Sequence, residues 1–119
     1  MCVKVLLAED AEAVRQAIRI LLSEREDITL VGEAATLSEA IQKAEELRPD
    51  EIIFDLHMAD GAKQHLFAGT KQLAISFAND DEANTLADGI GAARLLNKLE
   101  LANELIPAIL ELAPEWTAT

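Results

Sequence analysis

The stretch VKVLLAED, residues 3–10, is a short apolar run that ends in two acidic residues. Six residues dense in Val and Leu and bounded by charge are typical of a strand that is buried on both faces of a parallel sheet. The same pattern recurs in ITLVGEA at 28–34 and in EIIFDL at 51–56. These segments predict the first three strands of one sheet.

Apolar residues between these segments follow helical spacing. The first helical face consists of Val14, Ile18, Leu21 and Leu22. The second consists of Leu37, Ala40, Ile41, Ala44 and Leu47. Thr36 and Glu39 stand at the spacing of a capping box, and Pro49 prevents the second helix from continuing. The first half therefore predicts the order strand, helix, strand, helix, strand.

The second half of the chain continues this alternation. QLAISF at 72–77 and ARLLN at 93–97 predict two more strands. Asp80 and Asp81 are candidate N-caps of a helix between them. The apolar face of that helix consists of Ala83, Leu86, Ala87 and Ile90. Within residues 57–71, Gly61 and Gly69 bracket AKQHLFA at 62–68, which has room for about two helical turns, so we expect a short or irregular third helix there.

A last helix is indicated by an apolar stripe near the end of the chain. The stripe consists of Leu101, Leu105, Ile109 and Leu112. Because Pro107 fits best in a first helical turn, this helix is expected to begin near Asn103 or Glu104. Five strands alternating with helices predict an α/β fold, a doubly wound parallel sheet with right-handed connections. A chain of 119 residues fits one domain, 1–119.

Composition excludes several classes of partner and compartment. The chain carries 22 acidic and 10 basic residues, a formal charge of -12, and few aromatic residues. A nucleic-acid surface or binding to an anionic membrane would need basic clusters, so neither is expected. The single Cys2 excludes an internal disulfide. No apolar run reaches the roughly 20 residues of a spanning helix, and the start resembles no signal peptide, so the cytoplasm is the expected compartment.

Polar residues stand where the predicted strands end. These residues are Glu9 and Asp10 after the first strand, Asp55 in the third, Ser76 in the fourth and Lys98 after the fifth. In parallel sheets, ligands bind outside these strand ends. Three converging carboxylates would repel one another unless a hard cation such as Mg²⁺ offset them. A hydroxyl and an ammonium nearby suit an anion, so the set predicts a site that stabilises a phosphoryl group on an aspartate.

At these residues the chain resembles the response-regulator receiver domain of bacterial two-component signalling. The resemblance rests on VKVLLAED, on IIFDLHM at 52–58, and on the Ser76-to-Lys98 spacing with its Gly91-Ala92 pair. It extends over nearly the whole chain and implies a flavodoxin-like fold with strand order 2-1-3-4-5.

The resemblance also implies a role for each residue at the strand ends. Asp55 would accept a phosphoryl group from the phosphohistidine of a histidine kinase or phosphotransfer protein. The implied magnesium ligands are Glu9, Asp10, Asp55 and the backbone carbonyl of His57. The implied phosphoryl-binding groups are Ser76, the backbone amide of Phe77, and Lys98. Movement of the Ser76 hydroxyl would then shift the surface of the helix at 83–90, the strand at 93–97 and the last helix.

Such a protein would be a signalling protein and not an enzyme with a diffusible substrate. Its chemistry would be limited to self-phosphorylation and self-dephosphorylation at Asp55. The downstream effector is not readable from the sequence, and a homodimer stays open. The last residues, ELAPEWTAT at 111–119, carry no further hydrophobic pattern, so no attached output domain is expected. A stand-alone receiver and an excised one both stay open.

Two alternatives keep part of this interpretation. The first is a pseudo-receiver that binds partners without phosphorylation, because Phe77 stands where the family usually has a small residue and the 57–71 interval is short. The second, a more remote one, is an aspartate-nucleophile phosphohydrolase. That class requires a second acid two residues after the nucleophile, and the position holds His57.

Overall fold

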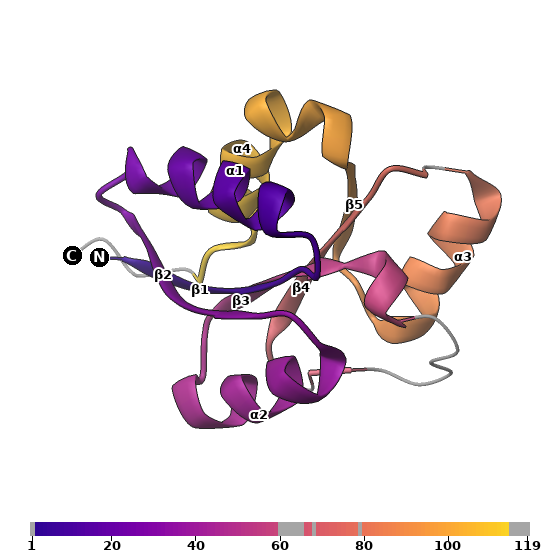
Figure 1. Ribbon diagram of the computed structural model, residues 1–119, viewed down its shortest axis with the longest axis horizontal. Helices are drawn as coiled ribbons and strands as arrows, with labels where there is room; N and C mark the ends of the chain where they lie inside the picture. The colour runs from indigo at the N-terminus through magenta and orange to yellow at the C-terminus, as the bar shows by residue number, and fades with distance from the viewer. Residues whose placement is uncertain (1, 60–65, 68, 79, 115–119) are drawn as a thin grey trace.

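The computed structural model describes residues 2–59, 66–67, 69–78 and 80–114. Strands and helices alternate along the chain (Figure 1). The strands are β1 (Val3–Ala8), β2 (Ile28–Ala34), β3 (Glu51–Asp55), β4 (Lys71–Ser76) and β5 (Arg94–Asn97). The helices are α1 (Glu12–Ser23), α2 (Leu37–Leu47), α3 (Asp81–Ile90) and α4 (Leu101–Leu112). Short 3-10 turns, Leu56–Ala59 and Lys98–Glu100, follow β3 and β5.

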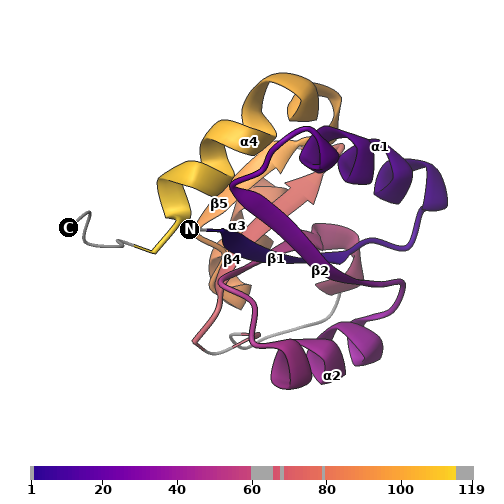
Figure 2. The ribbon, with the colours of Figure 1, turned by 90° about the vertical axis from the view of Figure 1, so that its left-hand side faces the viewer.

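The five strands form one parallel sheet in the order β2-β1-β3-β4-β5. This order confirms the predicted doubly wound α/β fold. Helices α1 and α4 cover one face of the sheet, and α2 lies on the opposite face (Figures 1 and 2). Residues of α3 belong to the same buried hydrophobic cluster as Ala40 of α2. α3 therefore lies on the same face of the sheet as α2, and two helices cover each face.

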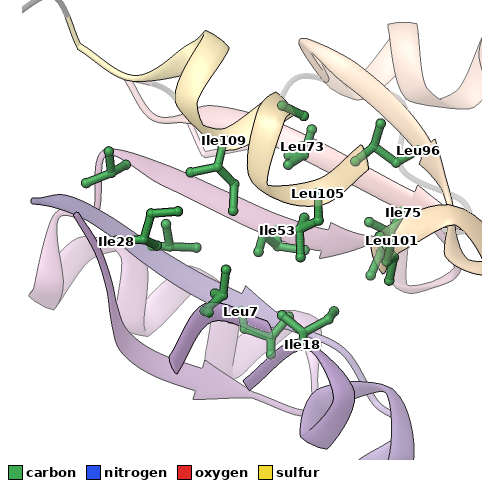
Figure 3. Close-up of a cluster of buried hydrophobic side chains, with 14 residues drawn as sticks. Leu7, Ile18, Ile28, Ile53, Leu73, Ile75, Leu96, Leu101, Leu105 and Ile109 are labelled. Atoms are coloured by element: carbon green, nitrogen blue, oxygen red, sulfur yellow. The ribbon is translucent and has the colours of Figure 1, made fainter. Parts of the chain in front are cut away.

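Alternate residues of the central strands fill two separate cores. Leu7, Ile53 and Ile75 face α1 and α4, where they pack with Ile18 and Leu105 (Figure 3). The core on the other face includes Leu6, Ile52 and Phe54. Because both faces of these strands are buried, their sequences are continuous apolar runs and not alternating ones.

Helix ends follow the capping signals of the sequence. The Thr36 hydroxyl accepts a hydrogen bond from the Glu39 N–H at 3.1 Å. The Asp80 carboxylate accepts one from the Ala83 N–H at 2.9 Å, so Asp80 is the cap of α3 and Asp81 is its first residue. Among the described helices, none is both long and apolar enough to cross a membrane.

The last helix begins earlier than predicted. α4 starts at Leu101 and not near Asn103 or Glu104, so Pro107 lies inside it. The missing N–H and the ring of a proline cost about 3 kcal/mol in a helix interior. Burial of Leu101 and Leu105, worth about 1.5 to 3 kcal/mol for each side chain, offsets this cost.

The predicted short third helix, between 57 and 71, falls largely on residues outside those that the structure describes. On its near side, β3 runs directly into the 3-10 turn Leu56–Ala59. On its far side, the side-chain amide of buried Gln72 donates to the carbonyl oxygens of Leu66 and Ile90. These bonds fix the segment before β4 against the end of α3.

Glu51 is a buried acid where β3 begins, at the end of the sheet opposite to Asp55. Neither of its carboxylate oxygens has a hydrogen-bond partner among the described residues. Burial raises the pKa of Glu51 to about 8, against the opposing effect of the Lys71 ammonium, while the Asp50 carboxylate adds to the rise. Glu51 is therefore mostly protonated at neutral pH.

Replacing Glu51 by Gln should remove part of the pH dependence of stability. A glutamate in the unfolded chain ionises near pH 4.5, whereas Glu51 in the folded chain ionises near pH 8. Between these values the folded chain holds the extra proton. The free energy of unfolding of the wild type, relative to E51Q, should therefore fall as the pH rises through this window, by at most about 1.4 kcal/mol per pH unit, and level off above it.

Urea denaturation at about pH 5.5, 7 and 8.5 measures this difference. Glu45→Gln is the matched control, because Glu45 is exposed on α2 and its replacement should leave the slope unchanged. Parallel curves for the wild type and E51Q would mean that Glu51 is ionised in the folded protein.

Candidate functional site

The carboxyl ends of the parallel strands lie at one edge of the sheet, and polar residues gather there. Glu9 and Asp10 follow β1, and Asp55 ends β3. Carboxylate oxygens of these three residues lie within 4.8 Å of one another. Ser76 ends β4 and Lys98 follows β5 at the same edge. The structure therefore brings three acids from two neighbouring strands together at this edge, and we call the edge, with the hollow beside Ser76 and His57, the cleft.

Lys98 supplies the positive charge of this cleft. Its Nζ lies 2.9 Å from Glu9 Oε2 and 3.3 Å from Asp55 Oδ1. The Lys98 side chain is only 8% exposed, and both carboxylates are buried. Charges in such a place need partners, because removing an ion from water costs several kcal/mol. A single ammonium thus bridges the ends of β1 and β3.

The backbone beside Glu9 orients its carboxylate. Glu9 Oε1 accepts a hydrogen bond from the Ala11 N–H at 3.1 Å. The carbonyl oxygen of Glu9 accepts one from Arg15 Nη1 at 2.7 Å, which ties α1 to the end of β1. Arg15 also pairs with Glu12 one helical turn earlier. Hydrogen bonds to Ala11 and Arg15 therefore fix the turn that carries Glu9 and Asp10.

The two acids of the pair differ in their tendency to hold a proton. Burial raises the pKa of Glu9, although the neighbouring Lys98 ammonium opposes the rise. Asp10 is exposed, and a hydrogen bond with the Glu9 carboxyl is the first cause that lowers its pKa. Asp10 is therefore the acid of this pair that stays ionised most readily. An ionised, accessible carboxylate is a suitable ligand for a cation.

Asp55 has a fixed carboxylate. Its Oδ1 accepts a hydrogen bond from the His57 N–H at 3.1 Å and lies near the Lys98 ammonium. Only 2% of Asp55 is exposed. The His57 side chain is exposed, at the rim of the cleft. No described contact assigns the His57 carbonyl to a metal, so that ligand stays a prediction.

Ser76 and Phe77 complete the edge. The Ser76 hydroxyl oxygen accepts a hydrogen bond from the Ala78 N–H at 3.0 Å, so its own proton is left to be donated elsewhere. The Phe77 ring lies over the Lys98 ammonium, with Nζ 5.0 Å from the ring centroid. No described contact of the Phe77 amide places it in a binding role, and that role also stays a prediction.

Two hollows differ in their relation to this edge. The larger, about 940 Å³, lies away from the acids, between the end of α2 and the start of β4, and includes Arg48, Asp50 and Lys71 in its wall. The smaller, about 310 Å³, opens beside Ser76 and His57. Only the smaller one adjoins the carboxyl ends of the strands, where ligands of such sheets bind, and its lining does not include the three acids or Lys98.

The donor set of the cleft fits a hard divalent cation. It consists of carboxylate oxygens, which Mg²⁺ prefers over nitrogen or sulfur ligands. Three carboxylates face one ammonium, so an additional positive charge would relieve their repulsion. Among the residues that the structure describes, Glu9, Asp10 and Asp55 form the cluster that could hold such an ion.

Two contacts of the site were not expected from the sequence. The first is the hydrogen bond from Arg15 to the Glu9 carbonyl. Arg15 lies one turn into α1, five residues after Asp10, and this short separation in sequence could have indicated that its long side chain reaches the end of β1. The contact of the Phe77 ring with Lys98 had no local signal, because it depends on the order of the strands.

Comparisons with known proteins agree with this architecture. A family model described as "Response regulator receiver domain" matches residues 5–110. Response regulator protein VraR of Staphylococcus epidermidis (strain ATCC 12228) is 52% identical over 60 residues, which are 50% of this chain and 29% of VraR. The matched region is thus less than a third of that relative's length.

Two solved structures share the fold. The response regulator domain of Thermotoga maritima CheB has a TM-score of 0.78 and 22% identity, over 94% of this chain and 96% of that one. The non-phosphorylated receiver domain of RcsB from Escherichia coli has a TM-score of 0.80 and 20% identity, over 94% of this chain and 93% of that one.

Replacing Asp10 by Asn should weaken magnesium binding by at least about tenfold, because a direct ligand would be lost and even outer-shell changes cost that much. Isothermal calorimetry with Mg²⁺ measures the affinity. Asp88→Asn is the matched control, since Asp88 is an exposed acid on α3 outside the acidic cluster. Equal affinity in the wild type and D10N would remove Asp10 from the ligand set.

Proposed function

The chain belongs to the response regulator receiver domain family, and on this premise we propose that Asp55 accepts a phosphoryl group from a histidine kinase or phosphotransfer protein. The observation that carries the proposal is the buried Asp55 carboxylate with the Lys98 ammonium 3.3 Å from its Oδ1. An acid kept in such a place at the cost of desolvation is suited to chemistry and not to solubility.

The proposed reaction is a phosphoryl transfer to a carboxylate. An Asp55 Oδ atom attacks the phosphorus of phosphohistidine, and an O–P bond forms as the N–P bond breaks. The imidazole leaves with the electron pair of that bond and takes up a proton from water. The product is an acyl phosphate on Asp55. Loss of the group is hydrolysis: a water oxygen attacks the phosphorus, the bond to the Asp55 oxygen breaks, the carboxylate leaves with its electron pair, and inorganic phosphate and a proton pass to the solvent.

Charge stabilisation is the main contribution of the protein to this reaction. The Lys98 ammonium is already at Asp55 and can pair with a phosphoryl oxygen. The Ser76 hydroxyl has a proton to donate to another oxygen, and the Phe77 amide is proposed to donate to the same group. When bound, Mg²⁺ would offset the carboxylates and the phosphoryl charge. Its proposed ligands are Glu9, Asp10, Asp55 and the His57 carbonyl.

The signal is proposed to leave the site through Ser76. Movement of its hydroxyl toward a phosphoryl oxygen would change the hydrogen bond with Ala78 and so the loop that leads into α3. The surface formed by α3, β5 and α4 is the proposed output surface. A formal charge of -12 favours protein partners over nucleic acid or anionic membranes for this chain.

A phosphorylation-independent pseudo-receiver is the second candidate function. The observation in its favour is the Phe77 ring beside Lys98 at the rim of the cleft, where it could narrow access for a phosphodonor.

Incubation with acetyl phosphate and Mg²⁺, followed by intact-mass measurement, separates the two candidates. The wild type should gain the mass of one phosphoryl group. Asp55→Asn should gain none, because an amide is a poor nucleophile, and Asn has nearly the same shape as Asp, so the site should otherwise be preserved. An unmodified wild type, or an equal gain in D55N, would rule out phosphorylation at Asp55 and favour the pseudo-receiver.

A further inference from the structure

Phe77 is a large apolar side chain in an exposed place. It follows β4, and 61% of its surface is exposed, so burial alone gives little reason for an aromatic ring there. Its ring nevertheless lies over the Lys98 ammonium, 5.0 Å from centroid to Nζ. A cation within about 6 Å of a ring centroid, over the face, is attracted by the quadrupole of the ring. The contact therefore has a specific chemical character.

Strand order explains why this ring meets this lysine. β4 lies between β3 and β5 in the sheet. Lys98 follows β5, whereas its partner Asp55 ends β3, so the lysine side chain must cross the end of β4. Phe77 is the first residue after β4, and its ring lies beside that path. The contact follows from the topology and not from a chance surface rotamer.

A neutral ring suits this cleft better than another acid would. Three carboxylates already converge there, and a fourth would add repulsion. The ring attracts the ammonium without adding negative charge. When Asp55 becomes an acyl phosphate, its carboxylate charge is lost, whereas the contacts of Lys98 with Glu9 and with the ring do not depend on that charge.

We propose that Phe77 is a positioning residue, whose ring holds the Lys98 ammonium at Asp55, where phosphoryl oxygens would arrive. The positioning itself stands on the observed contact, and its effect on phosphoryl transfer rests on the proposed function. This proposal gives Phe77 a role in phosphoryl transfer, whereas the pseudo-receiver hypothesis takes the same residue as an obstacle to phosphorylation.

Three variants test this role. Phe77→Leu keeps apolar bulk without the quadrupole, and Phe77→Tyr keeps the aromatic face. Leu99→Ala is the matched control, because Leu99 is 75% exposed and adjacent to Lys98 but has no ring. Thermal unfolding midpoints should agree among all four proteins, since these side chains are mostly exposed.

The first readout is the proton chemical shift of the Lys98 ε-methylene in the unphosphorylated protein. Ring current should move it upfield of the other lysines in the wild type, in F77Y and in L99A, and this displacement should vanish in F77L. A displacement that is the same in F77L as in the wild type would overturn the proposal.

The second readout is the rate of phosphorylation by acetyl phosphate at fixed Mg²⁺. F77L should react roughly three- to tenfold more slowly, the range that a partly exposed cation–π contact implies, while F77Y and L99A keep the wild-type rate. A rate in F77L equal to or above that of the wild type would overturn the proposal, because a ring that only crowds the cleft speeds the reaction when it is removed. A wild type that accepts no phosphoryl group would contradict the proposed function instead, and the chemical shift would still decide whether the ring contacts Lys98 in solution.

Discussion

The Lys98 ammonium lies between the carboxylates of Glu9 and Asp55, and the rest of the cleft depends on this pairing. Moving each carboxylate out of water costs several kcal/mol, and the attraction of the ammonium offsets this cost only partly. A buried group of this kind adds little net stability. Its proposed use is chemical, since it would hold a nucleophilic carboxylate beside a positive charge in a place from which water is largely excluded.

The order of the strands makes the pairing possible. β1 and β3 are neighbours, with Ala8 opposite Phe54. The residues next to these two in the sequence, Glu9 and Asp55, therefore meet at the sheet edge. β5 lies two strands away from β3, and only a long side chain can reach across β4. Lysine has that reach, and the path places its ammonium against Phe77. The same topology thus supplies the acid cluster, the bridging cation and the ring.

Much of this arrangement could be predicted from the sequence. Buried parallel strands are continuous apolar runs, so the segments at 3–8 and 51–56 indicated both the sheet and the acids at its edge. The cap at Thr36 was readable because it is a local interaction. The start of α4 was predicted wrongly, since the preference of Pro107 is also local, whereas the burial of Leu101 that outweighs it is not.

Other features had no signal that the sequence could carry. Glu51 belongs to a predicted strand, but whether its carboxylate finds a partner depends on the residues of β1 and β4 beside it. The contact between Phe77 and Lys98 likewise needs the order of β3, β4 and β5. Patterns of burial are local in sequence, whereas satisfaction of polar groups is a property of the assembled fold.

Charge balance in the cleft is the central claim, because three carboxylates face one ammonium and a divalent cation would supply what is missing. A crystal structure obtained with Mn²⁺ in place of Mg²⁺ tests it most directly, since the anomalous signal locates the ion. The expected result is a peak in contact with the carboxylates of Asp10 and Asp55, with Lys98 still beside Asp55. An ion found only elsewhere on the acidic surface, or a cleft without an ion at saturating Mn²⁺, would contradict the claim.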